Sequence, residues 1–236
     1  MGWKLTWIVP FWSVFIAMAN SLQLPKFEDL KAHYPGYRHY GGKYSDTELY
    51  TLIGRQTKHW RHNTSSLRLS YTLNTIGGRH AVVNHLPTYT VQKNETIRGK
   101  DNHRYIFRAI ASGPFLAAKY ESPVILRLHS GGPDVIAKFL MGKQGIVRLL
   151  TFRERTLHAD GHMALWDCDH FHQIKDFSRS HHIIAVELWQ TPDSHCPVKK
   201  QTHKKHPRVH INSTTYKFRS KTRPKHHFKH RAHSRQ

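Results

Sequence analysis

The chain is poor in acidic residues. Asp and Glu number 15 among 236 residues, against 37 Lys and Arg, and the formal net charge is +22 with the 22 His counted as neutral. No acidic residue follows Asp193, and residues 197–236 are dominated by Lys, Arg and His with few apolar side chains. Such a segment cannot bury enough apolar surface to offset the entropy lost on ordering. We therefore predict a disordered cationic tail over 197–236 and exclude it from the folded domain.

Long hydrophobic runs are also scarce, and the one present lies at the start of the chain. Lys4 belongs to a short basic start, residues 5–19 are mostly apolar, and an A-x-A cleavage pattern stands at 17–19. Pro10 interrupts the run, which is shorter than the roughly 20 residues of a spanning helix. The pattern predicts a signal peptide over 1–19 and a secreted, extracellular protein, with an uncleaved anchor as the alternative. No other segment could span a membrane.

Cysteine is nearly absent, which leaves room for one disulfide at most. In an exported chain Cys168 and Cys196 are expected to be joined, although two separate buried thiols are the alternative. A loop of this length would stabilise the fold by about 3–4 kcal/mol in the chain-entropy model. Sequons at Asn63, Asn94 and Asn212 are predicted glycosylation sites in a secretory pathway, although such triplets also arise by chance.

Residues 23–196 are long enough for one compact domain with a sizeable core. Apolar periodicity, capping residues and glycine stops predict its elements. Helices are expected over 27–30, 45–53, 63–76, 114–120 and 132–141, and strands over 104–110, 123–128, 145–152, 161–166 and 182–190. Because helices come first and several strands follow late in the chain, the pattern indicates an α+β domain with an antiparallel sheet.

The helix that starts near Asn63 carries a candidate nucleophile position. Asn63 or Thr64 can cap it, and Ser65 falls in its first turn. A side chain there faces the positive end of the helix dipole and uncommitted N–H groups, which lower a thiol pKa and stabilise an oxyanion. The alternative is that Thr64, Ser65 and Ser66 are only capping hydroxyls.

A histidine and an aspartate lie on one predicted strand, but periodicity alone does not make them a catalytic pair. In a regular strand His162 and Trp166 share one face and Asp167 points to the other. A contact between His162 and Asp167 therefore requires a bulge or a turn at the strand end. In a chain with 22 histidines, one of them near an aspartate is also expected by chance.

Five short sequence blocks follow one another across the predicted domain. They are N-T-S-S-L-R-L-S from Asn63, Y-I-F-R from Tyr105, G-I-V from Gly145, G-H-M-A-L-W-D from Gly161 and I-I-A-V-E-L-W from Ile183. In order and spacing they resemble the fourth amidase-effector family of bacterial type VI secretion, over roughly residues 34–189. The resemblance implies a papain-like, NlpC-type core in which the helix with the nucleophile position packs on an antiparallel sheet.

The resemblance also implies an activity, because members of that family are cysteine amidases that cleave the peptide stems of peptidoglycan. It places the nucleophile at Ser65, the general base at His162 and the orienting carboxylate at Asp167, with Asn63 and Trp166 as substrate-binding residues. It implies no cofactor and no metal. The family's cysteine is replaced by Ser65, and a hydroxyl cannot be ionised in advance as a thiol can. Loss of a nucleophile can lower the rate by about 10⁶, so we expect an impaired enzyme.

These features predict a secreted protein, derived from a peptidoglycan amidase, that binds the bacterial cell wall as an antibacterial factor. Its own signal peptide and cationic tail differ from a machine-delivered effector and suggest a captured effector gene. Peptidoglycan and other anionic envelope polymers are the expected partners. The alternatives are an active Ser–His–Asp amidase, a protein whose tail binds a polyanion such as heparan sulfate or nucleic acid, and, with least support, metal binding by the His-rich tail.

Overall fold

The computed structural model describes residues 22–55, 63–82, 95–129, 132–153 and 158–197. The predicted signal peptide, the sequons at Asn94 and Asn212 and nearly all of the predicted tail lie outside these residues. Within the described residues, no helix combines the length and apolar character needed to cross a membrane.

Five α-helices and three short 3₁₀ helices are present in the described residues. The α-helices are α1 (Phe27–His33), α2 (Asp46–Leu52), α3 (Ser65–Ile76), α4 (Ala109–Lys119) and α5 (Pro133–Leu140), and the 3₁₀ helices are η1 (Arg38–Tyr40), η3 (Gly78–His80) and η5 (Phe177–Arg179). The capping box predicted at the start of α2 is confirmed: the Ser45 hydroxyl accepts the Glu48 N–H, and the Glu48 carboxylate accepts the Ser45 N–H at 2.8 Å. Because each side chain satisfies an orphan N–H group, this helix can begin after an irregular segment.

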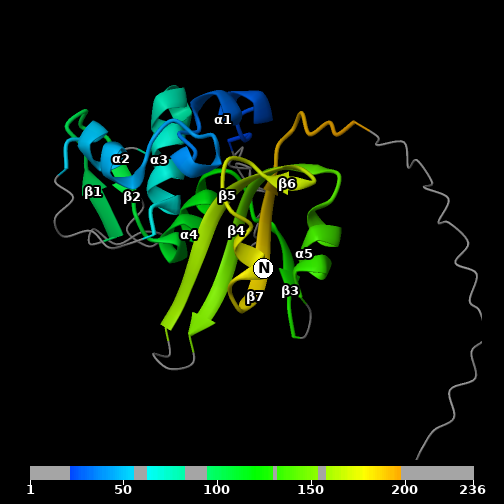
Figure 1. Cartoon of the computed structure of the whole chain (residues 1–236). Coiled ribbons are helices and arrows are strands. Elements are labelled where there is room, and N and C mark those ends of the chain that lie inside the picture. Colours follow the sequence, from blue (N-terminus) through cyan, green and yellow to red (C-terminus); the bar gives the residue numbers. More distant parts are fainter. Residues whose placement is uncertain (1–21, 56–62, 83–94, 130–131, 154–157, 198–236) are drawn as a thin grey trace, which may run out of the picture. The chain divides into compact units, whose positions relative to one another are not determined.

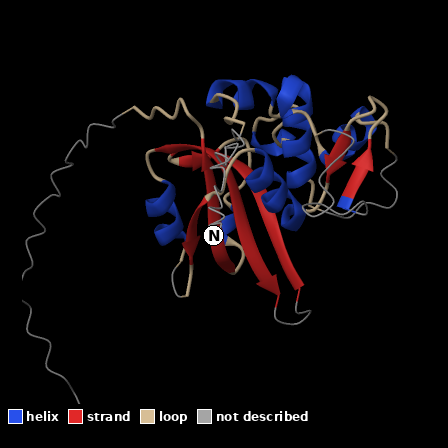
Figure 2. Cartoon of the chain, turned by 180° about the vertical axis from the view of Figure 1, so that it is seen from behind, coloured by secondary structure: helices blue, strands red, loops and turns tan. Residues whose placement is uncertain are grey.

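The strands form two antiparallel sheets. A small ribbon pairs β1 (Thr96–Arg98) with β2 (Arg104–Ile106). The main sheet has the order β3-β7-β4-β5-β6, formed by β3 (Val124–Arg127), β4 (Lys143–Arg153), β5 (His158–Cys168), β6 (His170–Phe171) and β7 (Ile183–Gln190). Figure 2 shows helices between the ribbon and the main sheet. The predicted antiparallel sheet and the α+β class are therefore confirmed, with strands β4 and β5 longer than expected.

Both faces of the main sheet are buried, by different elements (Figure 1). On one face Met163 and Leu165 of β5 pack with the apolar side of α3, including Leu69 and Leu73. On the other face Ala164 of β5 joins a second cluster with α5. Alternation along a strand sends successive side chains to opposite faces. The near-continuous apolar composition of β4 and β5 follows from this two-sided burial.

Two predictions about the segment between β2 and α4 were wrong. The strand expected over 104–110 ends at Ile106, and the helix expected from Pro114 already begins at Ala109. Pro114 therefore lies inside α4, where it has no N–H to give to the carbonyl of Ile110. The Arg148 guanidinium donates to that carbonyl instead, with Nη1 at 3.0 Å. A hydrogen bond from the sheet thus compensates for the proline.

Arg148 also makes a buried ion pair with its neighbouring strand. Its Nε and Nη2 donate to the Glu187 carboxylate of β7 at 2.7 and 2.6 Å, and each side chain is about a tenth exposed. The guanidinium reaches α4 because Gly113 has no side chain: a Cβ at that position would overlap it. One cation therefore joins β4, β7 and α4.

A second buried guanidinium fixes the start of α3. Arg68 is fully buried and donates to Asp46 Oδ1 at 2.7 Å, to the Tyr44 carbonyl at 3.1 Å and to the Gly36 carbonyl. Its charge also lies over the Tyr37 ring, 3.9 Å from the centroid. These contacts join α3 to the start of α2 and to the irregular segment before it. Arg68 therefore fixes the first turn of α3, which carries Ser65, against residues that do not belong to the sheet.

The disulfide predicted between Cys168 and Cys196 is present in the structure. The two Cα atoms are 5.5 Å apart, and 28 positions separate the residues. Cys168 has a positive φ of 59°, so the bond fixes a tight turn just after β5. By the chain-entropy model, closing this loop stabilises the fold by about 3–4 kcal/mol.

We expect Gly113→Ala to destabilise the fold by about 3 kcal/mol or more, because the new Cβ overlaps the Arg148 guanidinium and disturbs its buried ion pair. Urea unfolding followed by circular dichroism measures the change. Gly132→Ala is the matched control, since no atom lies within 4 Å of a Cβ there. Equal stability of the two variants would contradict this role for Gly113.

Candidate functional site

Ser65 lies at the start of α3, where the helix meets strand β5. Its side chain is almost fully buried, at 1% relative exposure, and its Oγ accepts the Met163 N–H at 3.0 Å. The hydroxyl is therefore used to join α3 to the strand and not to cap the helix, which was one of the sequence-based alternatives. Ser66 is also buried, and none of the described residues hydrogen-bonds its Oγ.

Asn63 connects this helix start to the candidate base. Its Oδ1 accepts the Ser65 N–H at 3.0 Å, and its Nδ2 lies 3.1 Å from the Gly161 carbonyl and 2.9 Å from His162 Nδ1. The residue at the N-cap is Thr64, whose hydroxyl donates to Asp46 and makes no capping bond, and the N–H of Ser65 in the first turn is accepted by Asn63 instead. Ser65 and His162 are thus brought to one place, with the Asn63 amide beside both.

The backbone contacts of Asn63 also fix the tautomer of His162. The Ser65 N–H can only donate and the Gly161 carbonyl can only accept, so the amide oxygen must face the first and the amide nitrogen the second. The same nitrogen then donates to His162 Nδ1, whose lone pair is occupied. In the neutral ring the proton is therefore on Nε2, and this buried atom has no hydrogen-bond partner within the described part of the chain.

His162 lies in an apolar, aromatic environment. It is 5% exposed and stacks on the Phe177 ring of η5, with the centroids 4.3 Å apart. Burial and, to a smaller extent, the neighbouring His181 lower the pKa of His162 to about 3. Desolvation disfavours the charged ring, so His162 is neutral at physiological pH.

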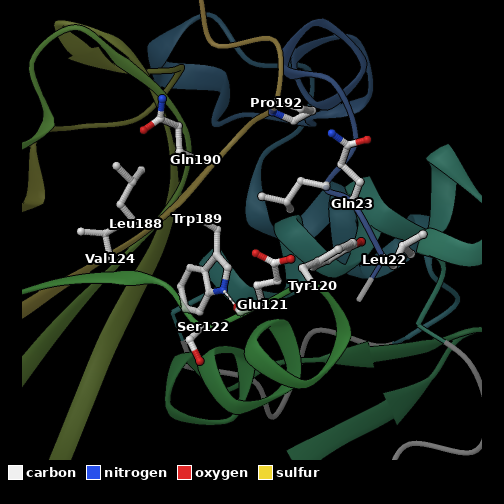
Figure 3. Close-up of a pocket in the computed structure, with 11 residues that line it drawn as sticks. Leu22, Gln23, Tyr120, Glu121, Ser122, Val124, Leu188, Trp189, Gln190 and Pro192 are labelled. Carbon is white, nitrogen blue, oxygen red and sulfur yellow. Dashed lines mark hydrogen bonds between the residues drawn. The ribbon is translucent and has the colours of Figure 1, made fainter. Parts of the chain in front are cut away.

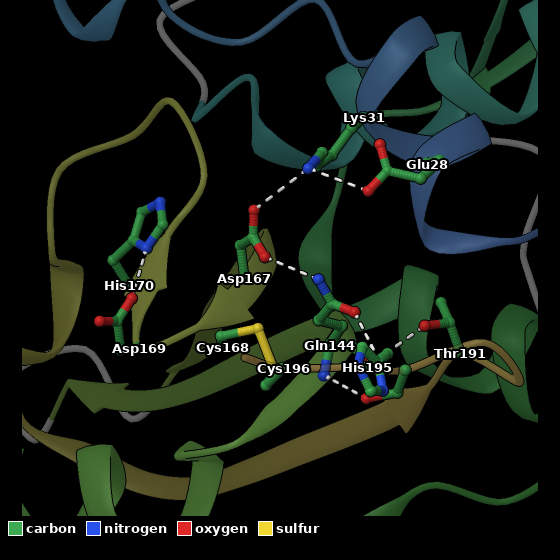
Figure 4. Close-up of a disulfide and its surroundings, with 11 residues drawn as sticks. Glu28, Lys31, Gln144, Asp167, Cys168, Asp169, His170, Thr191, His195 and Cys196 are labelled. Atoms are coloured by element: carbon green, nitrogen blue, oxygen red, sulfur yellow. Dashed lines mark hydrogen bonds and ion pairs between the residues drawn. A yellow bond between two sulfur atoms is a disulfide. The ribbon is translucent and has the colours of Figure 1, made fainter. Parts of the chain in front are cut away.

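Asp167 makes its contacts away from His162. Its Oδ1 accepts from Gln144 Nε2 at 2.8 Å, and its Oδ2 lies 3.4 Å from the Lys31 ammonium of α1. Figure 4 shows these two partners approaching the carboxylate from different directions. Strand β5 pairs with β4 in continuous register, without a bulge between His162 and Asp167. The structure therefore brings Ser65 and His162 together but not Asp167.

Trp166 shares the sheet face of His162 and lines a cavity of about 220 Å³. Its indole N–H is buried and finds no hydrogen-bond partner among the residues that the structure describes. Asp176, Ser178 and Arg179 line the same cavity and flank Phe177, the residue that stacks on His162. Trp166 and the residues that flank Phe177 therefore line one cavity on the His162 face of the sheet.

A larger cavity, of about 500 Å³, lies elsewhere in the fold (Figure 3). Its lining includes Leu22, Tyr120 and Trp189, and the Trp189 indole N–H donates to the Glu121 carbonyl at 2.8 Å. Ser65, His162 and Asp167 do not line it. Size alone therefore does not identify the candidate site.

Sequence reasoning missed two residues that determine the surroundings of the candidate site. Gln144 is the partner of Asp167, and Phe177 supplies the ring on which His162 stacks. Gln144 pairs directly opposite Asp167 in the β4–β5 ladder, so the hairpin register was the signal that could have found it. Phe177 comes from a separate 3₁₀ helix, and no sequence pattern linked it to β5.

Residues 61–189 match the model of the family described as type VI secretion system amidase effector protein 4, Tae4. The chain belongs to the Tae4 family. The matched segment contains Ser65, His162 and Asp167 together, so the resemblance expected from the sequence blocks is confirmed. A comparison with curated protein sequences gives no match.

Solved Tae4 structures have the same fold. The Tae4 effector from Enterobacter cloacae is 21% identical, with a TM-score of 0.54, and the match covers 72% of this chain and 99% of that chain. The Tae4–Tai4 effector–immunity complex from Salmonella Typhimurium gives 20% identity, a TM-score of 0.55 and coverage of 72% and 100%. The papain-like α+β core predicted from the resemblance is therefore the Tae4 fold.

We expect the buried imidazole of His162 to make stability depend on pH. Because burial lowers its pKa to about 3, the stability from the neutral ring is fully present above about pH 6.5 and falls as the pH decreases toward 3. The slope is about 1.4 kcal/mol per pH unit below the unfolded pKa of about 6.5, so between pH 7 and 4 His162→Gln should lose about 3 kcal/mol less than the native chain. Urea unfolding at several pH values measures this, with the exposed His39→Gln as control. Parallel curves for native chain and His162→Gln would rule out a low pKa.

Proposed function

We propose that this Tae4-family protein is an exported cell-wall-binding protein that recognises peptidoglycan stem peptides and hydrolyses them slowly or not at all. The observation that carries the proposal is the environment of Ser65. A hydroxyl stands where the family resemblance implies a thiol, it is buried, and it is hydrogen-bonded to the Met163 N–H of the adjacent strand.

The chemistry of the nucleophile supports impaired hydrolysis. A thiol at a helix start beside a histidine can be ionised before the substrate arrives, with a pKa lowered to about 3–4. A serine hydroxyl must lose its proton during attack, which requires a base in contact with it. In this chain the Ser65 Oγ accepts a hydrogen bond from a backbone N–H, and His162 Nδ1 is engaged by Asn63.

The state of the candidate base supports the same conclusion. A general base works best with a pKa near the working pH, whereas burial holds that of His162 at about 3. The carboxylate that would stabilise a charged imidazole is bonded to Gln144 and Lys31 instead. Both nucleophile and base therefore differ from what amide hydrolysis needs, and replacing Ser65 alone does not correct the base.

Binding of stem peptides is supported by the cavity beside Trp166. The buried indole N–H has no partner in the described residues, so a ligand carbonyl that reached it would relieve a desolvation cost of about 1–3 kcal/mol. The flanking acidic, basic and hydroxyl side chains suit a peptide with both charged and polar groups. The basic excess of the chain adds attraction for anionic wall polymers, which salt screens.

An export route is part of the proposal and rests on the sequence. The predicted signal peptide over 1–19, the sequons and the disulfide all suit an oxidising secretory pathway. A glycan on Asn63 would be attached to the nitrogen that contacts Gly161 and His162. Peptide mapping of secreted material would decide whether Asn63 is modified.

We expect the native chain to co-sediment with purified peptidoglycan sacculi without releasing muropeptides above the level of Ser65→Ala. Ser65→Cys is also expected to release none, because the low pKa of His162 disfavours a thiolate–imidazolium pair. Chromatography of the soluble fraction measures release. The Salmonella Typhimurium Tae4 effector is the control that shows whether the sacculi can be digested.

Two further results would change the assignment. Release by the native chain that Ser65→Ala abolishes would identify an active serine amidase. Release by Ser65→Cys would mean that the lack of a thiol at position 65 is the only defect of the site. To separate the domain from the cationic tail, sacculi stripped of anionic polymers are used at about 0.5 M NaCl, where exposed charges are strongly screened. Loss of all binding there would favour a polyanion-binding function of the tail.

We expect Trp166→Phe to bind soluble stem peptides about 2–10-fold more weakly, because a ligand hydrogen bond to the indole contributes about 0.5–1.5 kcal/mol. In the free protein the same change removes a buried donor that lacks a partner among the described residues but also leaves a cavity in the core, so we expect a loss of stability of about 1–2 kcal/mol. Isothermal titration calorimetry measures the affinity, and urea unfolding measures the stability. Unchanged affinity would show that the indole N–H does not contact the peptide.

A further inference from the structure

Three potential metal ligands converge at the turn between β5 and β6. One ligand atom from each of Asp167, His170 and His172 lies within 4.8 Å of the other two. Asp167 pairs directly opposite His170 in the β5–β6 ladder, and the His172 N–H continues this pairing by donating to the Leu165 carbonyl at 2.9 Å. Because His170 and His172 are two positions apart, alternation places them on one face of the hairpin with Asp167.

The cluster has supporting contacts that orient two of the three side chains. The Asp169 carboxylate contacts His170 Nδ1 at 2.8 Å, which leaves Nε2 as the atom that can bind a metal. Gln144 donates to Asp167 Oδ1, and the neighbouring Cys168 is fixed by the disulfide to Cys196. A carboxylate behind a ligating histidine is the usual second layer of zinc sites.

We propose that Asp167, His170 and His172 form a binding site for a Zn²⁺-like divalent cation. Two imidazoles and one carboxylate are a common ligand set for zinc, with a fourth position open to water. Bond lengths of about 2.0–2.2 Å require the ligand atoms to lie closer together than 4.8 Å, and the exposed His170 ring can make that adjustment. This site does not depend on the proposed peptidoglycan binding, and it departs from the sequence-based expectation of no metal.

A lysine, Lys31, lies against the cluster. Its ammonium lies 3.4 Å from Asp167 Oδ2 and 3.1 Å from Glu28. A bound metal would repel it, and Glu28 offers an alternative partner. Lys31 therefore competes with a metal ion for Asp167, and its removal should strengthen metal binding.

The test uses the full chain, titrated with Zn²⁺. Acylation of histidines, mapped by mass spectrometry, reports each ring separately, so binding by histidines elsewhere does not obscure the result. Zn²⁺ is expected to protect His170 in the native chain while the exposed His39 stays reactive. Asp169→Asn should raise the Zn²⁺ concentration needed for protection about 10–100-fold, and Lys31→Met should lower it several-fold.

Isothermal titration calorimetry independently measures how many Zn²⁺ ions bind to each chain. The exposed His170 can be replaced without disturbing the core, so His170→Ala is expected to lose one Zn²⁺-binding event, whereas His129→Ala, which removes another exposed histidine, keeps it. Circular dichroism checks that both variants are folded. Zn²⁺ that leaves His170 as reactive as His39, or equal stoichiometry in the two alanine variants, would overturn the site and assign metal binding to other histidines.

Discussion

The buried guanidinium of Arg148 is the interaction on which the arrangement of the domain depends. It forms an ion pair with Glu187 between two central strands and donates to the Ile110 carbonyl that Pro114 leaves without a partner. A buried cation is stable only when its donors are satisfied, so α4 and the sheet can pack in one relative position. A second buried guanidinium, that of Arg68, holds the first turn of α3 against Asp46.

Much of this fold could be predicted from local signals. The capping box at Ser45, the apolar stripe and glycine stop of α3 and the late strands each depend on neighbours in sequence. The Tae4 blocks then placed Ser65 and His162 at one site. The start of α4 could not be predicted in this way, because proline inside a helix is tolerated there only through Arg148, which is 34 positions away (148 − 114).

The chemical state of the candidate site was also beyond the sequence. The low pKa of His162 results from burial against Phe177, and its tautomer results from the orientation of Asn63 between two backbone groups. Asp167 was matched to a family role by its place in a motif, yet its contacts are to Gln144 and Lys31. Motif position identifies which residues are near the site, whereas packing decides which of them can exchange protons.

The continuous register of β5 has an evolutionary consequence. His162 and Asp167 are five positions apart, an odd number, and the ladder with β4 has no bulge between them. An odd separation puts the two side chains on opposite faces of the strand. A substitution cannot change this, but insertion or deletion of one residue between them can. Bringing these two side chains to one face of the strand would therefore require a change in chain length, whereas position 65 can be exchanged by a single substitution.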